Sequence, residues 1–214
     1  MRLILALLLI LPALSLRAQP GIIPYEVGPQ PAEFAGLLEA HNTWRSREGI
    51  PPLQWSPTAQ RQAEGWARQL AAEGCQLRFN PDPARRQNWG ENLYRSFSSQ
   101  PYEGYRRLPD EVVERWGGEG VHYDAASGRC SARSCGQFTQ LMWETTRVVG
   151  CARARCPTAE VWVCNYTPRG NVEGLKAWGN SAEALSRALN PPEPVLVPAT
   201  VAGECPAAPG WNAG

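Results

Sequence analysis

The sequence predicts an α+β domain, because helical periodicity dominates its first half and strand-forming residues dominate a later part. Apolar residues recur at helical spacing from Glu33 and again after Ser56. The ranges 147–155 and 160–166 are rich in Val, Trp and Tyr, which is typical of β-strands. With 214 residues and a hydrophobic fraction of 43%, the chain suits one domain of ordinary size with extensions.

Residues 1–18 have the features of a secretory signal peptide. Arg2 supplies the positive charge, residues 3–11 form an unbroken apolar run, and Ala18 is a small residue suited to cleavage. The alternatives are an uncleaved anchor and a buried helix, but the run is short for a membrane span. We therefore expect an exported chain, in which residues 19–32 form an irregular leader rich in Pro and Gly.

Two helices are predicted to open the domain. The first starts near Glu33 and ends within 49–52. Its apolar side carries Phe34, Leu37, Leu38, His41 and Arg45. The second has Ser56 as its N-cap and Pro57 in its first turn, and Gly74 is the expected stop. Its apolar stripe, which we expect in the core, comprises Ala59, Ala63, Trp66, Ala67, Leu70 and Ala71.

The rest of the chain alternates irregular segments with regular ones. Residues 79–88 contain two prolines and are expected to form a surface loop, and 96–107 are polar and irregular. A third helix is predicted over 110–116. The two strands are predicted to form a hairpin with its turn at 156–158. Residues 180–214 are rich in Pro and Ala and are expected to form a flexible tail.

Charge and cysteine content narrow the class of protein. A net charge of +1 without a basic stripe argues against a nucleic-acid partner. Lys176 is the single lysine among 21 basic residues, a bias that suggests a GC-rich bacterial source. Seven cysteines in an exported chain favour disulfides over a zinc-thiolate site, because Cys-x-x-Cys is missing and only two His are present. Cys205, alone in the tail, is expected to be free or to pair with another molecule.

Two motifs resemble the signatures of the CAP superfamily, which includes cysteine-rich secretory proteins, antigen-5-like allergens and plant pathogenesis-related proteins. Residues 135–143 read Cys-Gly-Gln-Phe-Thr-Gln-Leu-Met-Trp, where the family usually has Gly-His-Tyr/Phe-Thr-Gln-x-x-Trp. Residues 164–171 fit the second signature, Cys-Asn-Tyr-x-Pro-x-Gly-Asn, throughout. This resemblance implies a three-layer α-β-α sandwich over residues 33–179, with a small central, largely antiparallel sheet.

The six cysteines within the domain allow fifteen pairings, so the sequence alone leaves the disulfide pattern open. Cys151 and Cys164 lie on opposite strands of the predicted hairpin, which makes a bond between them reasonable. The placing of all six resembles the plant pathogenesis-related branch. That resemblance implies the pairs Cys75–Cys156, Cys130–Cys135 and Cys151–Cys164.

CAP domains typically hold two His and two Glu in a central cleft, where the His can bind a divalent metal. In this sequence Glu91, in Gly-Glu-Asn-Leu, and Glu119, in Trp-x-x-Glu, match the two acids. The two His positions fall at Phe79 and Gln137. Phe offers no ligand atom, and Gln offers one weak carbonyl oxygen and cannot act as an acid or base. We therefore expect no metal and no cofactor at this cleft.

Each candidate residue also has a structural interpretation. Glu91 could accept backbone N–H groups and tie its loop to the sheet, and His41 is expected to be a hydrogen-bonded core residue. His122 lies near Glu119 in sequence and could replace a lost ligand. Gln137 could hydrogen-bond one of the acids. If the two acids lie close together, one of them should have a raised pKa.

The leading hypothesis is a secreted or periplasmic, monomeric binding module without enzymatic turnover. Its partner would be an apolar small molecule, a wall component or an extracellular protein, and residues 101–107 with Tyr102 and Tyr105 could cover a lipid. The alternative is a hydrolase that uses Glu91 and Glu119 with His122 recruited. A third possibility is a structural surface protein with the Pro-rich tail as a tether.

Overall fold

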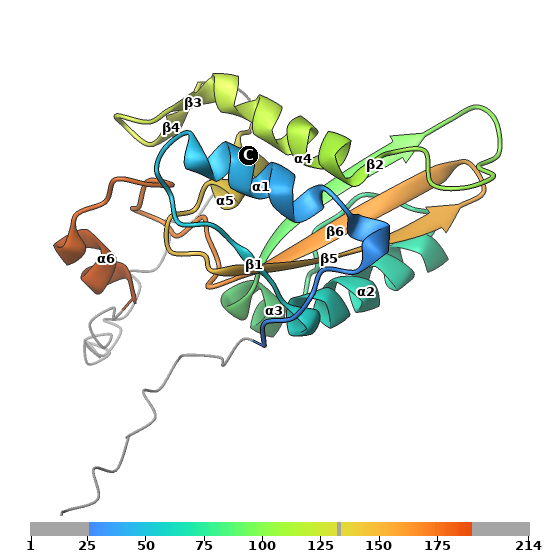
Figure 1. Ribbon diagram of the computed structural model, residues 1–214, viewed down its shortest axis with the longest axis horizontal. Helices are drawn as coiled ribbons and strands as arrows, with labels where there is room; N and C mark the ends of the chain where they lie inside the picture. Colours follow the sequence, from blue (N-terminus) through green and yellow to red (C-terminus); the bar gives the residue numbers. More distant parts are fainter. Residues whose placement is uncertain (1–25, 132–133, 190–214) are drawn as a thin grey trace, which may run out of the picture.

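The computed structural model describes residues 26–131 and 134–189, which form a central sheet between two layers of helices (Figure 1). The elements in the first part are η1 (Ala32–Phe34), α1 (Leu37–Ser46), β1 (Gln54–Trp55), α2 (Pro57–Ala72), α3 (Pro83–Asn88), β2 (Gly90–Phe97), α4 (Pro109–Gly117) and η2 (Gly118–His122). The others are β3 (Tyr123–Asp124), β4 (Arg129–Cys130), α5 (Gly136–Leu141), β5 (Val148–Cys156), β6 (Ala159–Thr167) and α6 (Ala182–Leu189).

The main sheet has four strands in the order β1-β5-β6-β2. Strand β1 runs parallel to β5, and the other neighbours are antiparallel, so the sheet is largely antiparallel as the family resemblance implied. Helices α2 and α3 lie on one side of it, and α1, α4 and α5 lie on the other (Figure 1). These are the three layers of an α-β-α sandwich, which confirms the predicted fold class.

Strands β5 and β6 form the predicted hairpin at the centre of the sheet. Every residue of β6 is buried, because both faces of the strand are covered by helices. Its side chains alternate between two cores: Val161 and Val163 pack with the α2 side, whereas Trp162 and Tyr166 pack with the α1 side. Because of this alternation, β6 packs against helices of both layers.

The predicted start of the second helix is confirmed. Ser56 caps α2, since its side-chain oxygen accepts the backbone N–H of Ala59, and Pro57 occupies the first position. The first helix begins later than predicted, however. Residues 32–34 form a separate 3₁₀ turn, and α1 starts only after Gly36, whose φ of 87° requires a left-handed backbone.

Two segments that were predicted to be irregular contain helices. The range 79–88, predicted as a surface loop, includes α3, which Asp82 caps by accepting the N–H of Ala84. The range 180–214, predicted as a flexible tail, begins with α6. The third predicted helix, over 110–116, is confirmed as α4.

Three disulfide bonds join Cys75 to Cys156, Cys130 to Cys135 and Cys151 to Cys164. These are the pairs that the family resemblance implied. The first ties the end of α2 to the end of β5, and the third links directly opposed residues of the central hairpin. The bonds therefore hold the helical layer to the sheet and lock the register of its two middle strands.

Several sequence predictions lie outside the described residues. They are the signal peptide (1–18), residues 19–25 of the leader, the tail beyond residue 189 and Cys205. The end of the leader packs on the domain, where Gly28 donates a hydrogen bond to the backbone oxygen of Trp55. Within residues 26–131 and 134–189, the helices are too short or too polar to cross a membrane.

Candidate functional site

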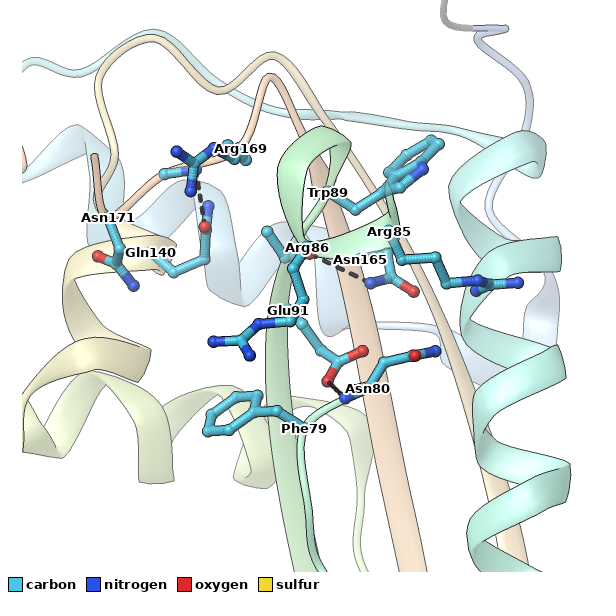
Figure 2. Close-up of a pocket in the computed structure, with 12 residues that line it drawn as sticks. Phe79, Asn80, Arg85, Arg86, Trp89, Glu91, Gln140, Asn165, Arg169 and Asn171 are labelled. Atoms are coloured by element: carbon cyan, nitrogen blue, oxygen red, sulfur yellow. Dashed lines mark hydrogen bonds between the residues drawn. The ribbon is translucent and has the colours of Figure 1, made fainter. Parts of the chain in front are cut away.

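A pocket of about 260 Å³ lies between the α3 segment, the start of β2 and the loop that follows β6 (Figure 2). Its lining residues are Phe79, Asn80, Arg85, Arg86, Trp89, Gly90, Glu91, Gln140, Asn165, Arg169, Gly170 and Asn171. They come from four separate stretches of sequence, which the sheet and α5 bring together. The lining is rich in guanidinium and carboxamide groups, with two aromatic rings and one carboxyl group.

Glu91 is the only acid in this lining, and it points into the centre of the pocket (Figure 2). Its Oε1 accepts the backbone N–H of Asn80 at 2.9 Å. Burial raises the pKa of the Glu91 carboxyl above its usual value, against hydrogen bonds from Asn80 and Asn165 and the positive charges of Arg85 and Arg86. By accepting this backbone N–H, Glu91 ties the loop at Asn80 to the sheet, which is the structural alternative that the sequence analysis gave for this residue.

Gln140 forms a rigid wall of the pocket. Its side chain is buried, and its Oε1 accepts the backbone N–H of Gly170 at 2.8 Å while its Nε2 donates to Thr146. A Cβ atom on Gly90 would lie 2.0 Å from this same oxygen, so only glycine allows the two segments to approach so closely. The wall that Gln140 forms on the side of β2 is therefore held in place by close packing.

Three arginines supply the charge of the pocket. Arg85 donates from Nη1 to the backbone oxygen of Gln62 at 3.1 Å, which anchors its guanidinium against α2. Within the part of the chain that the structure describes, the guanidinium groups of Arg86 and Arg169 have neither an ion-pair partner within 4.0 Å nor a hydrogen-bond partner. They are thus available to a ligand.

The four residues predicted for the cleft divide into two pairs. Phe79 and Glu91 line the pocket, and the Phe79 ring is 55% exposed. Glu119 and Gln137 do not line it. Glu119 instead lies at the start of α5, where its Oε2 accepts the backbone N–H groups of Gln137 at 3.0 Å and Phe138 at 3.3 Å.

The side chain of Gln137 bonds the backbone rather than an acid, contrary to the predicted bond to Glu91 or Glu119. Its Oε1 accepts the N–H of Leu93, and its Nε2 donates to the C=O of the same residue, both at 2.7 Å. Leu93 lies in β2, which is an edge strand of the sheet. The amide therefore satisfies two backbone groups that lack a neighbouring strand, in the manner of one further β-bridge.

The two histidines lie away from the pocket. His41 is buried in α1 and hydrogen-bonded at both ring nitrogens, which is the structural role that the sequence predicted. His122 is exposed at the end of η2 and does not line the pocket. No group of three or more His, Cys, Asp or Glu within the described residues is arranged to hold a metal ion. The residues present therefore do not fit the two-histidine metal site of the family.

Sequence reasoning missed the positive residues of this pocket, namely Arg85, Arg86 and Arg169, and the ring of Trp89. Two signals were present. An Arg-Arg pair stands three residues before Trp89, and Asp82-Pro83 is a helix start of the same kind as Ser56-Pro57. Arg169 occupies a variable position within the second signature motif, so the motif itself gave no indication of its role.

Fold and site together define a disulfide-linked α-β-α sandwich protein with a positively charged pocket beside the sheet. The chain belongs to the CAP family, described as the cysteine-rich secretory protein family, whose model matches residues 38–166.

Its relatives include plant pathogenesis-related proteins. Protein PRMS of Zea mays is 33% identical over 144 residues, which cover 66% of this chain and 80% of the relative. Protein 1A of Nicotiana tabacum is 36% identical over 139 residues, covering 64% of this chain and 76% of the relative. These relatives are plant proteins, so they give no support to the bacterial source that composition suggested.

Solved structures agree with the fold. Venom allergen-like protein 4 of Schistosoma mansoni is 22% identical with a TM-score of 0.51, covering 70% of this chain and 95% of the other. BmVAL-1 is 23% identical with a TM-score of 0.60, covering 77% of this chain and 88% of the other. At this level of identity the likeness concerns the fold alone.

Proposed function

We propose that this chain is a secreted binding module without enzymatic turnover, and that its ligand occupies the pocket beside Glu91. The observation that carries the proposal is the hydrogen bonding of Gln137. Its side-chain oxygen accepts the N–H of Leu93, and its side-chain NH₂ donates to the C=O of the same residue. A side chain used in this way is not free to bind a metal, and an amide cannot exchange a proton. Phe79, at the other family His position, contributes ring surface to the pocket and no ligand atom.

The hydrolase alternative has less support. Hydrolysis needs a nucleophile or activated water, a base, and a donor for the oxyanion. The pocket lining contains Glu91 as its one acid–base group, and it has no Ser, Thr, Cys, His, Lys or Tyr. The carboxylate of Glu119 is engaged by backbone N–H groups of α5, and His122 is exposed elsewhere. Binding is therefore favoured over turnover.

Export is part of the proposal. It is supported by the signal-like residues 1–18, by the three disulfide bonds and by the description of the family as secretory. We also infer that one folded domain, over residues 33–179, acts as a monomer. Its ligand would be a wall component, a lipid or an extracellular protein.

Native mass spectrometry of the protein exported into an oxidising medium, without added metal, tests the binding role. A retained organic mass that is lost when the pocket is filled by Arg169→Trp, a substitution at an exposed lining residue, would support the proposal. The control is Arg129→Trp, since Arg129 is exposed and does not line the pocket. An equal retained mass in both variants would place the ligand elsewhere and contradict the proposed pocket.

Turnover is tested separately with the double variant Glu91→Gln/Glu119→Gln. The wild type and the variant are incubated with a pool of esters, peptides and wall fragments, and the products are quantified by mass spectrometry. The proposal expects no product from either protein. A product that the wild type forms and the folded double variant does not form would overturn the non-enzymatic role.

A further inference from the structure

The pocket beside Glu91 carries more positive than negative charge. Its lining has three guanidinium groups, from Arg85, Arg86 and Arg169, against the single carboxyl of Glu91. The guanidinium group keeps its charge at any physiological pH. Arg86 and Arg169 form no ion pair within 4.0 Å among the described residues, and the single carboxyl of Glu91 does not balance three guanidinium groups. The pocket therefore favours a ligand with negative charge.

The two unpaired arginines approach the pocket from different segments. Arg86 comes from α3 and extends past Glu91, whereas Arg169 comes from the loop after β6 and lies on the side of Gln140 (Figure 2). A guanidinium group presents a planar fork of N–H donors that matches a planar carboxylate. A ligand carboxylate between these segments would be contacted from both sides.

The remaining lining suits a ring with hydroxyl groups. Phe79 has an exposed ring at the pocket, and Trp89 is partly exposed there. An apolar ring face exposed at a pocket is suited to pack against the apolar face of a ligand ring. The carboxamide of Asn171 donates to the backbone oxygen of Gly136 at 2.8 Å and accepts the hydroxyl of Thr139 at 2.6 Å. Because Asn171 is exposed at the pocket, its second N–H and the second lone pair of its oxygen remain open to a ligand.

Resting on the proposed binding role, we propose that this pocket binds a sugar residue that carries a carboxylate. Arg86 and Arg169 would bind the carboxylate, the exposed ring of Phe79 would pack against the sugar ring, and the free N–H and lone pair of Asn171 would bond its hydroxyl groups. The volume of about 260 Å³ is smaller than the roughly 300–1,000 Å³ typical of drug-sized ligands, so it suits a single sugar ring. Acidic polysaccharides of cell walls present such residues.

The environment of Glu91 is compatible with an anionic ligand. Because burial raises the pKa of this carboxyl, its neutral form is more accessible than that of an exposed Glu. A neutral Glu91 does not repel a carboxylate, and its O–H can donate a hydrogen bond to the sugar. The raised pKa of Glu91 therefore weakens the opposition of the one acid of the pocket to an acidic sugar.

The test is a titration of the ¹⁵N-labelled protein by NMR with galacturonate and with galactose, which differ in having a carboxylate or a hydroxymethyl group. We expect galacturonate to shift the amide signals of Gly90, Gly170 and Asn171, with a Kd at least about tenfold lower than that of galactose. Inorganic phosphate serves as an anion without a ring. Phe79→Ala should weaken the binding of galacturonate and leave that of phosphate unchanged.

A matched pair of variants separates specific contact from overall charge. Arg86→Gln/Arg169→Gln should raise the Kd for galacturonate by about tenfold or more. Arg115→Gln/Arg129→Gln removes the same charge from exposed positions outside the pocket, and it should change the Kd by less than about twofold.

Three outcomes would overturn the inference. They are equal affinity for galactose and galacturonate, equal affinity for phosphate with no effect of Phe79→Ala, and no shift with any of the three probes. None of them contradicts the wider binding role, because the native mass spectrometry experiment detects a lipid or protein ligand independently.

Discussion

His41 is fully buried in α1 against β6, and its hydrogen bonds fix one tautomer. Nδ1 lies 2.8 Å from the backbone oxygen of Leu37, which can only accept, so Nδ1 carries the proton. Nε2 then accepts the hydroxyl proton of Tyr166 at 2.8 Å. Burial lowers the pKa of His41 from 6.5 to about 4, and the nearby charge of Arg45 acts in the same direction.

We expect this residue to make the protein sensitive to acid. Between pH 6.5 and pH 4 the unfolded chain protonates His41 and the folded protein does not, so stability falls as the pH falls through this range. The loss should be about 3 kcal/mol. Urea unfolding across this range should show a smaller loss for His41→Gln than for the wild type. Equal losses in the two proteins would contradict the assignment.

Gln137 should contribute stability through its two bonds to Leu93. In Gln137→Ala, the N–H of Leu93 at the sheet edge loses its partner, which should lower the free energy of unfolding by about 1–3 kcal/mol. Gln76→Ala is the control, because Gln76 is exposed in a loop and should change stability by less than about 0.5 kcal/mol. If urea unfolding gives equal values for the two variants, the bridge to Leu93 is not a stabilising contact.

At the scale of elements, the long periodic segments could be predicted from sequence and the short ones could not. Helix α2 has 16 residues with an apolar stripe and a capping Ser56, so its period and its start were both visible. Helix α3 has six residues and no buried side chain, so it shows no period at all. Strand β1 has two residues, and it exists because β5 supplies parallel backbone partners. Such elements depend on tertiary contacts that local sequence does not encode.

Residues 101–107 were suggested as a cover for a lipid, and several hydrogen bonds tie this segment to the sheet. Glu160 of β6 is fully buried, and its two carboxylate oxygens accept the backbone N–H groups of Arg106 at 2.8 Å and Arg107 at 3.0 Å. Tyr102 donates from its hydroxyl to Ser96 at 3.0 Å. One acid in the sheet therefore holds the end of the loop through main-chain contacts.

Glu160→Gln should loosen this loop, since an amide has one acceptor oxygen and would direct N–H donors at one of the two backbone N–H groups. We expect the amide protons of Arg106 and Arg107 to exchange with solvent about tenfold faster. Hydrogen exchange measured by NMR gives this directly. Glu103→Gln, at an exposed position of the same loop, should leave both rates unchanged. Unchanged rates in Glu160→Gln would show that other contacts hold the loop.

At the scale of the whole molecule, the sequence identified motifs but not the composition of the pocket. Glu91 and Phe79 were found because they stand in or near family motifs. Arg86 and Arg169 are 83 residues apart and line the same pocket only because β2 pairs with β6 and α3 precedes β2. The family resemblance locates the two positions where the histidines are lost. It does not indicate which residues elsewhere in the chain give the pocket its chemistry instead. The charge of the pocket became visible only when distant segments were placed together.

The disulfide bonds should differ in their contribution to the stability of the whole domain. Cys75–Cys156 closes a loop with a sequence separation of 81, whereas Cys130–Cys135 has a separation of 5. The chain entropy that a cross-link removes from the unfolded state grows with loop length, which gives about 4.5 kcal/mol for the first bond and about 2 kcal/mol for the second. Urea unfolding of the paired Cys→Ser variants should therefore show a larger loss for 75/156 than for 130/135. Equal losses would mean that native-state contacts of the disulfides, and not restriction of the unfolded chain, determine their effect.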